Sequence, residues 1–467
     1  MSKLSLQLLR GRFQTFFQNS SNLRKVAIQG AVWSIAIYGL SIVVRLGSSL
    51  VMTRLLSPEI FGLMNLVYIV MNGLYLFSDI GSGPMIVRHE KGDDPKLLNT
   101  VWTAQVIRGV IVWLGCLAFA LPAVQFYNEP RLMWLLPIVG VSCIISSFHS
   151  TSIFTLTRNL DPKSFSFFEL KNQLVSTAIT IAIAIFFRNI WALVISYLVG
   201  QTIQAVWSHF LIPKYRNRFA WDKGYAKEFF HFGRWILIST MLTFLAGQID
   251  RILSGKLISW HFLGVYGVAV AISDLPRNIV ALLADRVLFP AVSQLIDLPR
   301  PELHHKLLKN RQSVLLAIAA GLGFFVAFGD LPISIMYDQR YGDGTWMLPL
   351  LALGLWPNIL FQTTYPILFA LGKPQYQTFG NAGKLLWTSL GIPFAYSHLG
   401  VLGVILVIML NDIPLYCVIS YGMFQEKLNT LKQDIVTTLL FLAGITGMVL
   451  IRYSLGFSWP LHKLWMP

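Results

Sequence analysis

The chain is poor in charged residues and in cysteine. Only 12% of its 467 residues are charged while 55% are hydrophobic, and the mean hydropathy is +0.61. This charge is too little to cover a soluble globule of that length, so the composition predicts a polytopic membrane protein. Three cysteines lie singly within apolar runs, without CxxC or metal-ligand spacing, and we interpret them as small core residues. They are Cys116, Cys143 and Cys417.

Sequence motifs for catalysis are also missing. The chain contains no HExxH, no GxSxG and no Walker motif, and the His304-His305 pair lies in a basic loop where solvation is expected. We therefore expect no catalytic residue, no metal ion and no cofactor. Without a nucleotide-binding loop, ATP bound to this chain cannot power its action.

Long apolar runs separated by short polar joints make up most of the sequence. Such runs predict membrane-spanning helices, whereas barrel strands would show shorter alternating segments. The expected fold is all-α: two pseudo-symmetric six-helix lobes around a central cavity, plus about one extra C-terminal span. The predicted spans are residues 31–56, 60–80, 101–122, 132–153, 170–187, 190–211, 234–254, 262–283, 313–334, 346–370, 377–397, 401–420 and 435–452.

Basic residues are concentrated in every second joint between these spans. One set of joints and termini carries 25 Lys and Arg residues and the other set carries 7. This positive-inside bias predicts a cytoplasmic amino terminus, and it explains the net charge of +16 without nucleic acid. Residues 3–25 either form an amphipathic helix on the membrane surface or are a frayed tail.

The chain divides into segments of different character. We expect a cytoplasmic amphipathic amino terminus (1–30), an N-lobe (31–211), a cytoplasmic linker (212–233), a C-lobe (234–420) and a C-terminal helix with an interfacial tail (421–467). Because six spans separate the two lobes, they would share one orientation in the membrane.

A weak internal repeat relates the two predicted lobes at an offset of 202 residues. In both copies a span is followed by an LLS or LIS turn and then by a glycine in the next span. The aligned identities are Trp33 with Trp235, Leu55 with Leu257, Ser57 with Ser259 and Gly62 with Gly264.

Five basic residues lie inside predicted spans, three or more residues from either end, at different depths. A guanidinium or ammonium group buried there costs several kcal/mol, from about 2.5 upward, unless it faces water or a partner. Arginine suits bidentate binding of phosphate, so a path lined by such cations favours an anion, particularly a pyrophosphate. The predicted substrate-binding residues are Arg45, Arg108, Arg251, Arg277 and Lys384.

Simpler explanations compete for three of these cations. Arg108 and Arg251 either take part in binding or reach the nearer membrane surface with their long side chains. Arg277 lies three residues after Asp274, so a local ion pair is its first explanation. Arg45 and Lys384 are too deep for these explanations, and we expect them to line a cavity.

Carboxylates are scarcer within the spans. Asp412 lies near the middle of its span, just before Pro414, which interrupts helical hydrogen bonding. A carboxylate at a broken helix is a common site of proton or sodium coupling, while an ion pair with a buried cation would explain it equally well. The predicted ion-coupling residues are Asp412, Asp250 and Asp274.

Two stretches of the sequence resemble a known family. They are RLGSSLVMTRLLSPEIFGLMNLVYIV, from Arg45 to Val70, and FSDIGSGPMIVRHE, from Phe77 to Glu90. Both resemble polysaccharide transporters or Wzx-type oligosaccharide flippases of the multidrug/oligosaccharidyl-lipid/polysaccharide exporter superfamily. The likeness extends less sharply over most of the chain.

The resemblance implies a fold, a function and partners. Such flippases move undecaprenyl-pyrophosphate-linked oligosaccharide repeat units across the bacterial inner membrane by alternating access, for assembly of capsule, exopolysaccharide or O-antigen. The implied partners are that lipid-linked substrate, membrane lipid, a coupling proton or sodium ion, a polysaccharide polymerase and a chain-length regulator. The alternatives are a multidrug or toxin extruder of the same superfamily, which should prefer acidic cavities, and a membrane polysaccharide polymerase or ligase, which usually needs a long outer loop.

Overall fold

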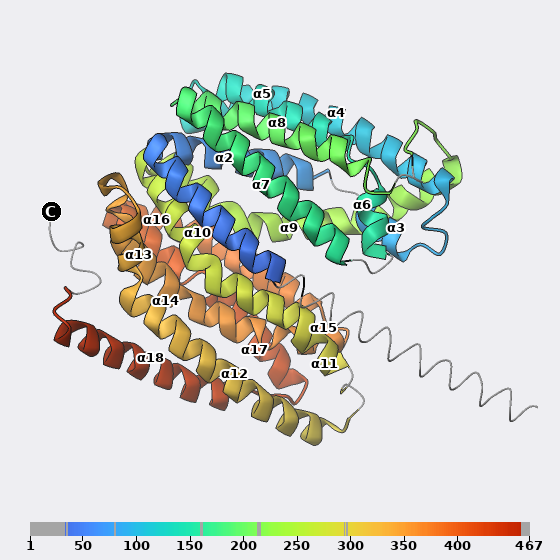
Figure 1. Cartoon of the computed structure of the whole chain (residues 1–467). Helices are drawn as coiled ribbons and strands as arrows, with labels where there is room; N and C mark the ends of the chain where they lie inside the picture. Colours follow the sequence, from blue (N-terminus) through green and yellow to red (C-terminus); the bar gives the residue numbers. More distant parts are fainter. Residues whose placement is uncertain are drawn as a thin grey trace, which may run out of the picture.

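The computed structural model of the protein is a bundle of helices (Figure 1). Within the described part of the chain every regular element is a helix, which confirms the all-α class predicted from the apolar runs. The predicted amphipathic segment 1–30 and the last residues of the interfacial tail lie outside the described residues. The structure describes residues 33, 36–78, 81–158, 162–212, 216–293, 295 and 298–458.

The first half of the chain forms one bundle, which we call the first bundle. Its helices are the first helix (Ala36–Leu55), α2 (Pro58–Leu76), α3 (Ser82–Arg88), α4 (Pro95–Tyr127), α5 (Leu132–Ser147), α6 (Ser152–Arg158), α7 (Pro162–Phe186) and α8 (Ile190–Ser208). Buried apolar side chains of α2, α4, α5 and α8 form its core. The short helices α3 and α6 pack against each other.

The second half forms another bundle, the second bundle, in which α10, α14 and α16 share an apolar core. Figure 1 shows α18 at its edge, beside α12. The helices of this half are α9 (Lys223–Leu257), α10 (Trp260–Leu283), the π-helical turn η1 (Ala284–Leu288), α11 (Phe289–Ser293), α12 (Arg300–Phe328), α13 (Asp330–Met336), the 3₁₀ turn η2 (Gln339–Tyr341), α14 (Gly344–Gln362), α15 (Tyr365–Ala370), α16 (Gln375–Met409), α17 (Ile413–Gln425) and α18 (Leu431–Ser454).

The number of membrane spans depends on how broken helices are counted. Nine described helices are long and apolar enough to cross a membrane, or up to ten if the bent pair α5 and α6 forms one span. Each of the thirteen predicted spans nevertheless falls on a described helix. The stretch Gln375–Gln425 counts once but holds two predicted spans, and α7 and α9 supply two more long helices. Gly400 separates the two spans of that stretch, with a φ of 57° that suits glycine.

The predicted repeat has equivalent helix boundaries in its two copies. The first helix ends at Leu55 and α9 ends at Leu257. The next helices, α2 and α10, begin at Pro58 and Trp260. Both pairs of boundaries differ by the offset of 202 residues found in the sequence.

Helices α2 and α10 pack against each other through the two equivalent glycines. A Cβ atom on Gly62 would overlap the carbonyl oxygen of Trp260, and one on Gly264 would overlap that of Pro58. The same offset relates Pro58 to Trp260, so the contact is reciprocal, as at a twofold axis. Without side chains at these two positions the helix backbones approach closely, as small residues allow in membrane bundles.

Polar contacts join the two bundles at the end where α2 begins, which we call the α2 end. His261 Nδ1 lies 2.8 Å from Glu59 Oε1, and these two residues are again related by the repeat. Arg340 Nη2 donates to the carbonyl oxygens of Thr53 and Arg54 at 3.3 and 3.4 Å. These carbonyls lie in the last turn of the first helix, where the helix dipole favours a cation.

The opposite end, where α4 begins, is called the α4 end. There Asp222 caps α9 by accepting a hydrogen bond from the Tyr225 backbone N–H, so α9 begins inside the predicted linker 212–233. The Tyr225 hydroxyl donates to Asp94 at 2.7 Å, and Phe229 is buried against α3 and α4. The start of α9 therefore packs on the first bundle, whereas its far end contributes to the second.

Two buried ion pairs fasten α18 to the second bundle. Asp434 near its start pairs with Arg311 of α12, and Arg452 near its end donates to Asp330 Oδ2 at 2.6 Å. Both arginines are buried, with exposed fractions of 6% and 1%, although neither was among the predicted site residues. A buried ion whose partner is removed is strongly destabilising, so these pairs define where α18 lies.

We expect the substitution Gly62→Ala to destabilise the protein, because the new Cβ would force α2 and α10 apart. Overpacking of this kind costs about 1–3 kcal/mol. The measurement is the apparent unfolding temperature of the detergent-purified protein. The matched control is Gly444→Ala on α18, where a Cβ meets nothing within 4 Å. Equal unfolding temperatures for the two variants would contradict the close approach of the helices.

Candidate functional site

One face of α10 carries several polar side chains of the candidate site. Ser273, Asp274 and Arg277 follow Tyr266 by seven, eight and eleven residues, which is two or three helical turns and places all four on one side of the helix. Residues of α9, α14 and α16 complete the site opposite this face. The site therefore lies within the second bundle.

A helix break supplies another of its side chains. Helix α16 ends at Met409 and α17 begins at Ile413, so a three-residue break interrupts the span predicted at 401–420. Pro414, in the first turn of α17, has no N–H and cannot continue the preceding helix. Asp412 occupies the N-cap position of α17 and is 3% exposed. The break lies where the sequence predicted it.

Asp412 is shared by two cations. Lys384 Nζ lies 2.7 Å from its Oδ1, and Arg277 Nη2 lies 2.9 Å from its Oδ2. Arg277 Nη1 also lies 3.3 Å from Asp274 Oδ1. The local ion pair expected for Arg277 and the ion pair considered for Asp412 are both present. The four groups form one chain of alternating charge that links α10, α16 and the helix break.

Helix α9 contributes a second set of charges. The Tyr266 hydroxyl donates to the Asp250 carboxylate, which is 9% exposed. Arg251 Nη1 donates to Gln248 Oε1 at 2.9 Å. Asp250 and Arg251 are adjacent in sequence and line the same cavity as Asp412. Helix α9 therefore adds one negative and one positive charge to this cavity.

These side chains surround a cavity of about 290 Å³. Among the described residues, no group of three or more His, Cys, Asp or Glu side chains is arranged to hold a metal ion. The cavity is lined by Gly247, Gln248, Asp250, Arg251, Tyr266, Val270, Ser273, Asp274, Arg277, Asn278, Leu351, Gly354, Leu355, Lys384, Ile408, Asn411 and Asp412.

The formal charges around this cavity cancel. Among the described residues, three carboxylates and three cations line it, and all six were predicted for the site. The sequence has five predicted cations and three predicted carboxylates within spans, and the cavity brings equal numbers of the two together. The physical reason is that isolated charges in a low-dielectric interior cost several kcal/mol, whereas paired charges recover most of that free energy.

The other two predicted cations lie elsewhere. Arg45, on the first helix, is exposed, and Arg108, on α4, is 7% exposed. The Arg108 guanidinium lies over the Tyr75 ring, 4.2 Å from the ring centroid, in a cation–π arrangement. Neither side chain lines the charged cavity, so the structure brings three of the five predicted cations together.

Tyr266 and Gln248 are lining residues that the sequence did not predict and that hydrogen-bond to the predicted charges. Tyr266, 1% exposed, orients Asp250, and Gln248 accepts from Arg251. Tyr266 lies seven residues before Ser273, which is two helical turns along the polar face of α10, and this signal could have identified it. Gln248 lies three residues before Arg251 in the same helix, which is hydrogen-bonding distance on a helix surface.

The fold and the cavity together define a polytopic, all-helical membrane protein with a balanced set of buried charges. The chain belongs to the family described as polysaccharide biosynthesis protein, whose pattern matches residues 51–343. That region includes the parts of α9 and α10 that line the cavity, while Lys384 and Asp412 lie beyond it.

Two curated proteins have sequences similar to this chain. The chain is 23% identical over 317 residues to the teichuronic acid biosynthesis protein TuaB of Bacillus subtilis (strain 168), covering 67% of this chain and 65% of TuaB. It is 20% identical over 325 residues to the succinoglycan biosynthesis transport protein ExoT of Rhizobium meliloti (strain 1021), covering 69% of this chain and 65% of ExoT. The matches thus span just under two thirds of each relative.

Solved structures share the fold. The lipid II flippase MurJ in an inward closed conformation aligns with a TM-score of 0.73 at 13% identity, covering 91% of this chain and 93% of MurJ. An inward-facing multidrug resistance MATE family transporter of the MOP superfamily aligns with a TM-score of 0.63 at 14% identity, covering 90% and 98%. At these identities the likeness concerns the fold alone.

We expect Asp412→Asn to destabilise the protein, because it leaves Lys384 and Arg277 without their shared counter-charge. Removing one partner of a buried pair costs about 3–5 kcal/mol. The double variant Lys384→Met/Asp412→Asn should recover part of this loss, since it removes one of the two stranded cations. The measurement is the apparent unfolding temperature in detergent.

The matched control is Asp338→Asn, which removes a carboxylate that is 39% exposed and pairs with Arg340. An exposed pair of this kind contributes about 0–1 kcal/mol. If Asp412→Asn behaves like Asp338→Asn, the buried network does not stabilise the second bundle.

Proposed function

We propose that this protein is a flippase for lipid-linked oligosaccharides. Its substrate would be an undecaprenyl-pyrophosphate-linked repeat unit, moved from the cytoplasmic to the periplasmic leaflet of a bacterial inner membrane for capsule, exopolysaccharide or O-antigen assembly. Membership of the polysaccharide biosynthesis family, a relative named as a succinoglycan transport protein and the fold shared with a lipid II flippase support this proposal. It is a transport function and not an enzymatic one.

The observation that carries the proposal is the sharing of Asp412 by Lys384 and Arg277 at the edge of a cavity. Two of the five N–H donors of Arg277 reach carboxylates, and its side chain is 29% exposed. The other N–H donors of Arg277, together with the Lys384 ammonium, can bind the oxygens of a pyrophosphate. Arg45 and Arg108 remain predicted contacts from the first bundle.

Ion coupling follows from the charge balance. A pyrophosphate entering a neutral cavity adds negative charge, which is costly at low dielectric unless a carboxylate is neutralised. A proton taken up by Asp412 would release Lys384 and Arg277 toward the substrate, and a sodium ion near Asp250 or Asp274 would also restore neutrality. Loss of the substrate on the other side would let the ion pairs form again, so that binding and release alternate.

A multidrug extruder of the same superfamily is the second candidate. The MATE transporter shares the fold, and three carboxylates line the cavity here. A cationic drug would have to compete with Lys384 and Arg277 for Asp412, which makes this function less favourable. A polymerase or ligase is disfavoured by the short joints between spans.

The proposed surroundings of the protein follow from the proposed function. The amino terminus would be cytoplasmic, in agreement with the distribution of Lys and Arg in the sequence. A polysaccharide polymerase and a chain-length regulator would act on the flipped repeat unit. Neither nucleic acid nor a bound cofactor is part of this proposal.

We expect Lys384→Ala and Arg277→Ala to reduce export of the surface polysaccharide at least tenfold in a strain that lacks the native gene. Loss of one charge-assisted contact to phosphate of about 1.5–3 kcal/mol accounts for that size. Arg45→Ala should reduce export as well. A loss of export is measured as accumulation of the lipid-linked intermediate on the cytoplasmic side. The amount of each variant in the membrane is quantified by immunoblot.

The control is Lys306→Ala, which removes an exposed lysine that pairs with Glu302 on α12. It should export normally. Full export by both cavity variants, at normal protein levels, would exclude the cavity as the binding site, and normal export with altered drug resistance would favour the extruder.

For coupling, we expect Asp412→Asn to weaken the dependence of flipping on a proton or sodium gradient, because the amide can neither bind a proton nor attract a cation. Flipping of a fluorescent lipid-linked saccharide is measured in vesicles with each gradient imposed separately. Asp338→Asn, outside the cavity, serves again as the control. Unchanged gradient dependence in Asp412→Asn would leave this residue with a structural role.

A further inference from the structure

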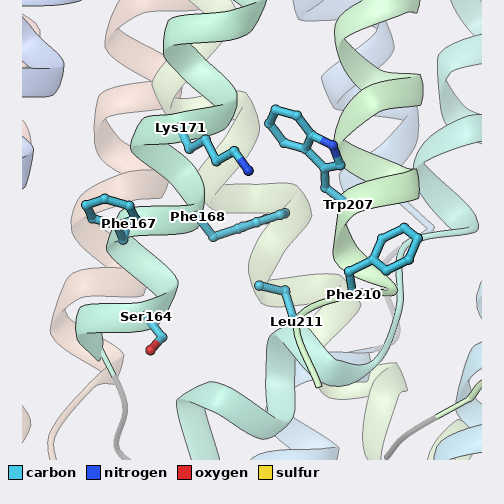
Figure 2. A pocket seen from close by; sticks show the side chains of 7 residues that line it. All are labelled: Ser164, Phe167, Phe168, Lys171, Trp207, Phe210 and Leu211. Carbon is cyan, nitrogen blue, oxygen red and sulfur yellow. The ribbon is translucent and has the colours of Figure 1, made fainter. Parts of the chain in front are cut away.

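A second pocket lies between the start of α7 and the end of α8 (Figure 2). Its volume is about 760 Å³, and it shares no residue with the charged cavity. Among the described residues it is lined by Ser164, Phe167, Phe168, Lys171, Trp207, Phe210 and Leu211.

The pocket combines apolar walls with one positive charge. Lys171 is the charged member of the described lining, and no carboxylate is part of that lining. Its ammonium lies over the Trp207 ring, 4.3 Å from the ring centroid, and Figure 2 shows both side chains pointing toward each other from α7 and α8. Phe168 is 6% exposed, whereas Phe210, after the end of α8, is 74% exposed.

The position of the pocket matches a membrane interface. It lies at the α4 end of the bundle, where α7 begins and α8 ends. The predicted orientation places this end on the cytoplasmic side, and Lys171 is one of the basic residues that produce that prediction. Tryptophan and lysine are typical of the level of lipid head groups, where one side of the residue is apolar and the other is wet.

We propose that this pocket binds an anionic phospholipid of the surrounding membrane. The lipid phosphate would lie at the Lys171 ammonium, and one acyl chain would extend along Phe168 and Phe210. A free phosphate ion would gain nothing from the aromatic walls. A zwitterionic lipid would bring its own cation close to Lys171, so a net negative head group is favoured.

Two other occupants fit the pocket less well. The lipid-linked substrate carries a pyrophosphate, which calls for more than one cation, and the described lining offers a single ammonium. The amino-terminal segment of the chain contains Lys3, Arg10, Arg12, Arg24 and Lys25, and this positive charge opposes Lys171. Charge complementarity therefore selects the anionic lipid.

A bound lipid would brace α7 where this helix also holds the first helix. Gln173 Nε2, two residues after Lys171, donates to the Ser41 carbonyl oxygen at 2.8 Å. A lipid wedged between α7 and α8 would therefore stabilise a contact between helices distant in the sequence. This lipid site does not depend on the proposed transport function, and either can fail without the other.

The test uses the full chain in detergent and native mass spectrometry, with phosphatidylglycerol or phosphatidylcholine added. We expect the wild type to bind phosphatidylglycerol more tightly, and Lys171→Ala to weaken that binding about fivefold, as one basic residue near an anionic membrane surface does. Lys171→Arg should retain the binding. The matched control is Lys227→Ala, an exposed lysine at the same end of the bundle. If Lys171→Ala cannot be purified, Lys171→Met replaces it.

Equal binding of the two lipids by the wild type, or unchanged phosphatidylglycerol binding in Lys171→Ala, would overturn the proposal. A photo-crosslinking amino acid in place of Phe210 identifies the occupant in cells. An adduct with an anionic phospholipid supports the proposal. An adduct with a lipid-linked saccharide or with a peptide from residues 1–32 overturns it.

Discussion

The charged site depends on one constraint, which is that a carboxylate buried in the middle of a helical bundle needs a counter-charge. Asp412 is placed there by a helix break, and Lys384 and Arg277 neutralise it from two other directions. Arg277 then needs Asp274 as a further partner, which makes the set of four neutral. Three helices must meet at this point, and the cavity lies among their charged side chains.

A neutral network suits a protein that must exist both empty and loaded. Without a ligand, Lys384, Asp412, Arg277 and Asp274 neutralise one another inside the chain, which stabilises the empty cavity. In the proposed function, an anionic group gains access to the cations only when a carboxylate loses its charge. The pairs that stabilise the empty protein would then also set the condition for binding. The stability of the second bundle and the proposed coupling would thus rest on the same residues.

The remaining structure consists of the two bundles and the contacts between them. Buried ion pairs at both ends of α18 make that helix part of the second bundle. The two bundles meet closely at Gly62 and Gly264, where backbone lies against backbone and a side chain would not fit. The pair of Glu59 and His261 lies beside this contact and repeats its symmetry. The repeat, weak in the sequence, is most evident in the structure where the two copies touch.

The sequence by itself determined the class of the protein through hydropathy, the helix boundaries of the repeat through residue spacing, and the break at Asp412 through a proline. Each of these signals acts within a short stretch of the chain. The sequence also placed Arg277 beside Asp274, one helical turn away. Only the tertiary structure decided that Lys384 and Arg277 share Asp412, that Arg45 and Arg108 lie apart from them, and that Arg311 and Arg452 are buried. Each of these outcomes depends on partners from helices far apart in the sequence. Burial and pairing of a charge are properties of packed neighbours, and local patterns do not specify those neighbours.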